Sequence, residues 1–189
     1  MELLRAIENR RSVRKFQQEP ISKETLLKLV DFARLSASPA NLQPLRYCII
    51  HSATLVKEVH PLTRWAAYLP DYPISDTERP TAYIVVLGDK NVASKFEYDA
   101  GAATTTIMLA AQMFGLGSCC IGNIERKKLA ELCRIDLSRY VICYLLAIGI
   151  PAQNNRAYND SSTVKYSIDE NGCFLVPKCP LEEVIIESL

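Results

Sequence analysis

Histidine is scarce in this sequence, which has only His51 and His60. None of its seven cysteines stands in a CxxC motif, and no Cys/His spacing typical of a zinc site is present. The residues directly after Met1 lack the apolar h-region of a secretory signal. We therefore expect no metal site, and a cytoplasmic location in which the thiols are reduced and mostly buried. The cysteines are Cys48, Cys119, Cys120, Cys133, Cys143, Cys173 and Cys179.

The sequence also lacks an excess of either charge and a long apolar run. Lysine and arginine total 22 and aspartate and glutamate total 21, a formal net charge of +1. A dedicated nucleic-acid-binding domain carries an overall basic excess. The apolar stretch at 100–116 is interrupted by three threonines and Gln112, and the stretch at 141–151 is too short to span a bilayer. We therefore expect neither a nucleic-acid partner nor a membrane.

The length and composition indicate a single domain over residues 1–189. Hydrophobic residues make up 49% of the 189-residue chain, which is ordinary for a globular protein. A chain of this length buries roughly two-thirds of its unfolded surface and needs no disulfides to fold.

Hydrophobic periodicity predicts helices that alternate with buried strands. Ser22 is a suitable N-cap for a helix over 23–35, and the unbroken apolar run at 82–87 indicates a strand buried on both faces. Three prolines make 69–80 irregular, and the polar segment from residue 152 onward is expected to be irregular too. Further helices are expected at 2–9, 54–60, 100–114 and 125–134, and further strands at 47–51 and 140–150. This alternation predicts an α/β or α+β layered domain.

Four segments carry residue types suited to ligand binding. In the first, Arg10, Arg11, Ser12 and Arg14 follow a helix, and guanidinium forks with a hydroxyl suit phosphate oxygens. A solvated basic surface is the alternative. The second is the loop at 36–44, SASPANLQP, whose prolines, small residues and amides suit the edge of a polar heterocycle, or form an ordinary connection.

The third segment, 115–123, follows the apolar helix at 100–114, which we expect to end at Gly115 and Gly117. Its GxG spacing does not indicate a dinucleotide fold, because that fingerprint follows a strand and opens a helix. We expect a loop whose backbone N–H groups reach a ligand. A Cys119–Cys120 redox pair is disfavoured, because vicinal disulfides are strained. The fourth segment, 176–181, holds Lys178 between two prolines.

Together, these segments resemble the nitroreductase family of flavin enzymes. That family is similar in its RRSxRxF-type start, its S-x-x-N-x-Q-P loop, its long apolar helix leading into G-L-G-S-C, and its late Pro-Lys-Arg-Pro-Leu-Glu-type segment. The resemblance implies an FMN-binding α+β fold with a central, mainly antiparallel sheet flanked by helices, in a homodimer with two flavins at the interface. Cys179 departs from the pattern, because the family often has arginine there.

The resemblance also implies roles for individual residues. Arg10, Ser12 and Lys178 would hold the FMN phosphate with Arg11 close by, and Arg14 would lie near N1–O2 as electrostatic support. The residues implied to reach the partner's flavin are Ser38, Pro39, Ala40 and Asn41, with Gln43 at the pyrimidine edge or ribityl chain. The residues implied to line the ring near N5 and O4 are Cys120, Ile121, Gly122 and Asn123.

The implied activity is that of an oxidoreductase in which the flavin carries the chemistry. NADH or NADPH would pass hydride to flavin N5, and a nitro compound, quinone or related small acceptor would then take the electrons in a ping-pong sequence. No catalytic acid or base is required. Two alternatives are a non-catalytic flavin- or nucleotide-binding regulatory protein and a nucleic-acid binder that uses residues 10–15.

Overall fold

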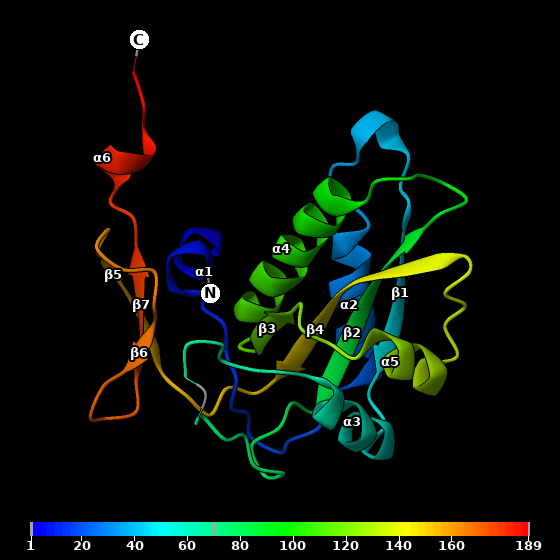
Figure 1. The fold of residues 1–189 in the computed structure, drawn as a ribbon, viewed down its shortest axis with the longest axis horizontal. Helices are drawn as coiled ribbons and strands as arrows, with labels where there is room; N and C mark the ends of the chain where they lie inside the picture. The colour runs from blue at the N-terminus through cyan, green and yellow to red at the C-terminus, as the bar shows by residue number, and fades with distance from the viewer. Residues whose placement is uncertain (1, 70, 189) are drawn as a thin grey trace.

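A four-stranded antiparallel sheet forms the centre of the protein in the computed structural model, which describes residues 2–69 and 71–188. The strands lie in the order β1-β2-β4-β3 (Figure 1). Their bounds are Leu45–Ile50 for β1, Ala82–Asp89 for β2, Gly117–Ile121 for β3 and Tyr140–Gly149 for β4. The expected α+β architecture with a mainly antiparallel central sheet is confirmed.

The two central strands are apolar on both faces because a helical layer covers each face. All eight residues of β2 are buried, as the unbroken apolar run predicted. One core cluster joins the sheet to α2 and α4, and the other joins it to α3 and α5. The helix bounds are Leu3–Asn9 for α1, Lys23–Ala33 for α2, Ala53–Val59 for α3, Glu97–Met113 for α4, Arg126–Cys133 for α5 and Leu181–Val184 for α6.

The predicted helices and strands are confirmed with shifted ends. Ser22 caps α2 as predicted, its side chain accepting a hydrogen bond from the Thr25 N–H. Residues 69 and 71–80 contain no helix or strand, as the prolines predicted, while Pro70 lies outside the described residues. The apolar side chains of α1 are exposed, and only Ala6 is buried. None of the helices within the described residues has the length and apolar character needed to cross a bilayer.

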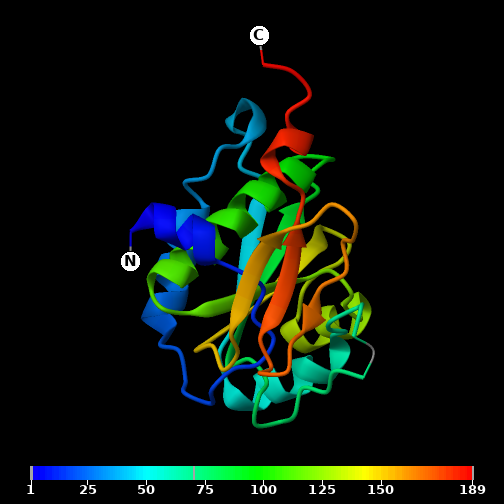
Figure 2. The same cartoon turned by 90° about the vertical axis from the view of Figure 1, so that its left-hand side faces the viewer.

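The prediction of an irregular tail from residue 152 was wrong. A second sheet, here called the C-terminal sheet, consists of β5 (Asn155–Asn159), β6 (Ser167–Ile168) and β7 (Phe174–Lys178), in the order β5-β7-β6. Phe174 is 1% exposed and anchors β7, although its neighbours in sequence are mostly polar. Figure 2 shows this sheet lying in front of the main domain, with the chain continuing through α6 to the C-terminus.

The prediction of a loop at 115–123 was also wrong in part. Gly115 ends the helical region with a φ of +76°, as expected, but Gly117 is the first residue of β3. β3 is an edge strand that pairs antiparallel with β4, and Gly117 lies opposite Gly149. The backbone groups of residues 117–121 therefore belong largely to the sheet, and only the turn after Ile121 is a connection.

Candidate functional site

The arginine segment, residues 10–14, lies along the free edge of β3. Ser12 forms a parallel bridge with Ser118, and the Val13 N–H donates to the Ser118 carbonyl at 2.9 Å. Val13 and Phe16 are buried in the core cluster on the α3/α5 side. The expected phosphate-binding residues are thereby brought beside the strand that leads to Cys120 and Ile121.

The paired glycines of β3 and β4 make room for this segment. A Cβ at Gly117 would come within 2.9 Å of the Val13 side chain, and a Cβ at Gly149 within 2.7 Å of the Phe16 ring. Such separations are closer than carbon atoms tolerate. Gly117 therefore serves close packing between the arginine segment and the sheet, rather than a turn that cradles a dinucleotide.

Gln153 fixes the backbone of the arginine segment and was missed at the sequence level. Its Oε1 accepts from the Arg14 N–H at 2.7 Å and from the Lys15 N–H at 3.0 Å. Its Nε2 donates to Asn155 Oδ1 at 2.6 Å. Nothing in the polar stretch around Gln153 marks it, because its role depends on contacts with residues far away in sequence.

Two aromatic residues near the C-terminal sheet hold the Arg14 side chain, and they too were missed. The Arg14 Cζ lies 4.6 Å from the Tyr166 ring centroid and 5.1 Å from that of Phe174. Tyr68 and Tyr72 extend this cluster, with ring centroids 5.1 Å from Tyr166 and 5.2 Å from Phe174, respectively. The apolar run at 174–176 was the available signal for a strand, and it was obscured by the surrounding polar residues.

The guanidinium groups of the arginine segment lack acidic partners. Among the described residues, none of the ion pairs includes Arg10, Arg11 or Arg14. Burial and the neighbouring Arg11 charge lower the pKa of Arg10. The Arg11 Nε is buried without a hydrogen-bond partner in the described structure. An anion bound here would relieve like-charge repulsion and satisfy a buried donor.

The two neighbouring cysteines of β3 are protonated at neutral pH. Burial raises the pKa of Cys119, while the charges of Arg14 and Arg10 and a hydrogen bond with Ser12 act in the opposite direction. Burial, with the neighbouring Cys119, raises the pKa of Cys120 to about 12. Since thiolates are the reactive form, these thiols are poor nucleophiles.

Gly122 and Asn123 form the short connection after β3, here called the Gly122 turn. The Gly122 carbonyl accepts from Arg126 Nη2 at 3.0 Å, and the Asn123 carbonyl accepts from the Arg64 N–H at 3.1 Å. Both residues are exposed, in contrast to buried Ile121. These two hydrogen bonds use the carbonyl oxygens of the turn, so its N–H groups are the ones that suit a ligand.

The loop at 36–44, here called the Ser38 loop, lies at the first turn of α4. Ser38 Oγ donates to Asp99 Oδ1 at 2.5 Å and accepts from the Gln43 N–H at 2.9 Å. Ala40, Asn41 and Gln43 have φ values of 49°, 55° and 51°. Residues other than glycine rarely adopt this left-handed backbone conformation. The loop therefore holds a specific, strained backbone shape.

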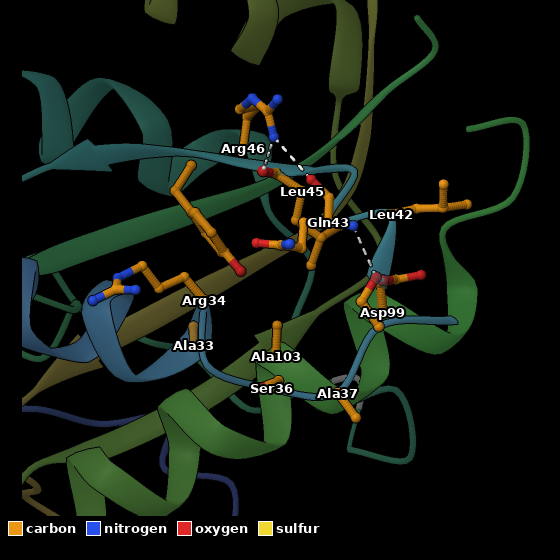
Figure 3. Close-up of a pocket in the computed structure, with 12 residues that line it drawn as sticks. Ala33, Arg34, Ser36, Ala37, Leu42, Gln43, Leu45, Arg46, Asp99 and Ala103 are labelled. Carbon is orange, nitrogen blue, oxygen red and sulfur yellow. Dashed lines mark hydrogen bonds between the residues drawn. The ribbon is translucent and has the colours of Figure 1, made fainter. Parts of the chain in front are cut away.

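An open cavity of about 390 Å³ adjoins the Ser38 loop (Figure 3). Arg34 and Arg46 supply positive charge to its wall, and Asp99 supplies negative charge. Burial and the Asp99 carboxylate raise the pKa of Tyr47, which also lines the cavity, to about 12. The loop thus borders a cavity whose wall carries charges of both signs.

The Ser38 loop and the arginine segment lie at different places along α4. Asp99, in the first turn of α4, holds Ser38, whereas Arg10 Nη1 lies 4.0 Å from the sulfur of Met108. Met108 lies nine positions after Asp99 in α4, which is about 13.5 Å along the helix axis. Within one chain the two groups of predicted site residues therefore do not form one cluster.

Lys178 is the last residue of β7 and is exposed. Its carbonyl accepts from the Asp160 N–H at 2.8 Å. No hydrogen bond or ion pair among the described residues joins Lys178 to the arginine segment. Next to it, the exposed Cys179 thiol lies 3.8 Å from Glu183 Oε2.

Comparison with protein families gives a match over most of the chain. The model of the Nitroreductase family matches residues 7–150. A protein of Archaeoglobus fulgidus, provisionally named NADH dehydrogenase/NAD(P)H nitroreductase, is 30% identical over 166 residues, which cover 83% of this chain and 90% of that protein. A protein of Methanothermobacter thermautotrophicus with the same provisional name is 25% identical over 160 residues, 82% of this chain and 80% of that one.

Solved structures share the fold over most or all of the chain. A provisionally named nitroreductase of Desulfovibrio desulfuricans, solved in complex with FMN, is similar with a TM-score of 0.72 and 24% identity, covering 100% of this chain and 98% of that one. An FMN-dependent nitroreductase of Clostridium difficile R20291 is similar with a TM-score of 0.67 and 25% identity, covering 84% and 92%.

Proposed function

The chain belongs to the nitroreductase family, and from this premise we propose that it is an FMN-dependent oxidoreductase with NADH or NADPH as electron donor. The proposal treats residues 1–189 as one FMN-binding domain. The observation that carries it is the arginine segment, a group of guanidiniums without carboxylate partners in the described structure, held rigidly against β3.

The arginine segment fits the phosphate of FMN. Arg10 and Arg11 provide the positive charge, and Ser12 provides a hydroxyl. The buried, unpaired Nε of Arg11 is the clearest sign that a ligand oxygen belongs here. Lys178 would add a further cation from the end of β7. Because FMN carries a single phosphate, no dinucleotide-binding loop is needed.

The ring of the flavin fits beside β3 and the Gly122 turn. Cys120 and Ile121 would line it, and Gly122 and Asn123 would offer backbone N–H groups toward N5 and O4. When bound, FMN would supply the carrier for a hydride and for the electrons that leave. Arg14 would stand near N1–O2, where its positive charge favours electron uptake. With their pKa values raised, the thiols of Cys119 and Cys120 would serve as lining of the site rather than as nucleophiles.

We further propose that two copies of the chain complete each site. In this arrangement Ser38, Pro39, Ala40, Asn41 and Gln43 would reach the flavin of the partner subunit, which accounts for their separation from the arginine segment along α4. An apolar groove of about 470 Å³ between α1, α2 and α4 supports an interface on this side. Leu3, Phe32 and Phe114 line it and are 53%, 38% and 44% exposed.

The donor and the acceptor would use the same open surface one after the other, which gives ping-pong kinetics. The proposed acceptors are nitro compounds, quinones and related small molecules. The chain's own contribution is to bind and orient, since no acid–base pair is required at this surface. Initial rates measured over a range of NADH concentrations at several acceptor concentrations would give parallel double-reciprocal lines.

The test begins with the chromophore released by heat from the purified or reconstituted protein. Mass spectrometry would identify it as FMN, and NADH or NADPH would bleach its absorbance. Arg10→Ala would raise the dissociation constant of FMN about 10- to 100-fold, because a charge-assisted bond is lost. Arg5→Ala, at an exposed arginine of α1, is the matched control and would leave the constant unchanged.

Three outcomes would overturn the proposal. Recovery of FAD, or of no flavin after reconstitution, would contradict the phosphate assignment. Bound FMN without turnover by either nicotinamide would favour a regulatory flavin-binding protein. A flavin-loaded monomer in sedimentation at micromolar concentration would contradict the shared site.

A further inference from the structure

A small cavity lies at one end of the central sheet, and none of the residues assigned to the flavin lines it. His51, directly after β1, Ala53, the first residue of α3, and Thr81, directly before β2, contribute to its wall. Its volume is about 100 Å³. A water molecule in the liquid occupies about 30 Å³, so the cavity has room for about three waters or one ligand of a few heavy atoms. It is too small for a nucleotide or an aromatic acceptor.

Two residues of this wall each have a buried polar atom that lacks a hydrogen-bond partner in the described structure. They are Arg79, at Nε, and Thr81, at Oγ1. Buried polar groups of folded proteins are almost always hydrogen-bonded to protein, to water or to a ligand. Because both atoms belong to the wall of one small cavity, a single occupant can satisfy them together.

The charge of Arg79 is not balanced by a carboxylate. Arg79 takes part in none of the ion pairs of residues 2–69 and 71–188. The carboxylates nearest to it in sequence are paired with other cations, Glu78 with Lys15 at 2.8 Å and Asp76 with Lys57 at 3.8 Å. Within the described part of the chain, no aspartate or glutamate lines the cavity. The cavity therefore favours an anion over a neutral occupant.

The polar groups of the wall suit the two oxygens of a carboxylate. Arg79 Nη1 donates to the Asp76 carbonyl, so the opposite edge of the guanidinium, formed by Nε and Nη2, is left for an occupant. Two parallel N–H groups on one edge match a carboxylate bidentately. The Thr81 hydroxyl is able to donate a further bond. Water would satisfy these donors, but it would not neutralise the guanidinium.

We propose that this cavity binds a small carboxylate anion of about the size of acetate. The carboxylate would accept from the Arg79 guanidinium and from the Thr81 hydroxyl. Its short apolar end would lie against Ala53 and buried Val56, which line the same cavity. The apolar part of the wall is what favours a carboxylate with an alkyl group over an inorganic oxyanion. The site is separate from the proposed flavin site and does not depend on it.

Titration of the full chain with sodium acetate tests the proposal. Saturation-transfer difference NMR of the acetate methyl protons is recorded at neutral pH, with sodium chloride keeping the ionic strength constant. We expect saturable binding with a dissociation constant on the order of millimolar, within the limit for a ligand of only four non-hydrogen atoms. The thermal unfolding midpoint should rise with acetate concentration, because the ligand binds the folded state. Sodium nitrate and sodium phosphate should bind more weakly than acetate.

Variants place the bound acetate within the molecule. Arg79→Gln should raise the dissociation constant about 10- to 100-fold, because a charge-assisted bond is lost. Thr81→Val keeps the shape of the side chain and should raise it by a smaller factor, about two- to tenfold. Arg156→Gln, at an exposed arginine of β5, is the matched control and should leave the constant unchanged. Arg10→Ala should leave it unchanged too, because the arginine segment is a different site.

The titration of the unaltered chain carries the test even where a variant folds poorly. No saturable binding at constant ionic strength would show that water fills the cavity and would overturn the proposal. Binding that Arg79→Gln and Thr81→Val leave unchanged, or that Arg10→Ala removes, would place acetate elsewhere. Tighter binding of phosphate than of acetate would contradict the carboxylate class. None of these measurements reads flavin or turnover, so failure here is distinguishable from failure of the proposed function.

Discussion

The guanidinium of Arg14 lies over the ring of Tyr166, with its Cζ 4.6 Å from the ring centroid. The Arg14 Cζ also lies 5.1 Å from the ring centroid of Phe174, which belongs to β7. Cation–π contacts of this kind contribute about 0.5–2 kcal/mol. The C-terminal sheet therefore orients a charged side chain whose backbone belongs to the N-terminal segment.

The first prediction tests that orientation. Arg14→Ala should lower the reduction potential of the bound flavin with a smaller loss of affinity, because a positive charge near N1–O2 is removed. Tyr166→Leu should lower the potential in the same direction by a smaller amount, because the charge remains but is no longer held. Tyr166→Phe retains the ring and should match the wild type. Redox titration of the three variants measures this, and equal potentials for the Leu and Phe variants would contradict the role of Tyr166.

The second prediction concerns the close contact of Gly117 with Val13. Gly117→Ala should destabilise the fold by about 1–3 kcal/mol, since the new methyl group would overpack against Val13. Gly101→Ala is the control, because nothing lies within 4 Å of a Cβ there. In a helix interior that change should stabilise by about 0.5–1 kcal/mol.

Denaturant unfolding measures both glycine variants, and a double variant identifies the cause. Val13→Ala introduced together with Gly117→Ala should be less destabilising than the sum of the two single changes, because the close contacts with both γ-methyl groups of Val13 are removed. Strict additivity would show that Gly117 is required for another reason.

The sequence predicted those elements whose signal is local. The apolar run of β2 and the N-cap at Ser22 each reflect neighbouring residues, and both are confirmed. The C-terminal sheet depends on the pairing of β5 with β7, and the polar residues between them hide the strands. Gly117 was misassigned because glycine commonly ends a helix, whereas here it provides space for Val13.

The same difference between local sequence signals and long-range contacts applies to the candidate site. The resemblance assigned residues 10–14 and 120–123 to different parts of one flavin, and the Ser12–Ser118 bridge places the arginine segment beside the strand that leads to residues 120–123. Gln153 and Tyr166 act through side-chain contacts with Arg14 that no spacing in the sequence reveals. The roles of all these residues toward a flavin remain predictions.

The third prediction is a pH dependence of stability that originates at Asp89. This carboxylate is fully buried and accepts from Arg139 Nη2 at 2.8 Å, with Arg46 Nη2 at 3.9 Å. The Arg139 hydrogen bond holds the pKa of Asp89 below its ordinary value of 3.8. A lowered pKa means that the folded state favours the carboxylate, so its stabilisation is complete above pH 3.8 and is lost as the pH falls through the lowered value.

Asp89→Asn should therefore lower the urea midpoint at pH 7, because the Arg139 charge loses its buried partner. The difference from the wild type should shrink as the pH falls below about 3.8. Asp71→Asn, at an exposed carboxylate, is the control and should change the midpoint at pH 7 far less. A difference that stays constant from pH 7 to pH 2 would show that the ion pair is not its source.

The last prediction concerns the end of β7, where the resemblance to the family implies an arginine in place of Cys179. Cys179→Arg should tighten FMN binding roughly five- to a hundredfold, because a charge-assisted bond to phosphate contributes about 1–3 kcal/mol. The gain should fall toward the lower figure, since Glu183 Oε2 lies 3.8 Å from the thiol and would compete for the new guanidinium. Lys178→Ala should weaken binding by a similar factor, and Lys127→Ala, at an exposed lysine of α5, should not change it. Flavin fluorescence titrations of the reconstituted protein measure all three constants. If Cys179→Arg and Lys178→Ala both leave the constant unchanged, the end of β7 does not contact the phosphate, and the arginine segment must hold it without help from Lys178.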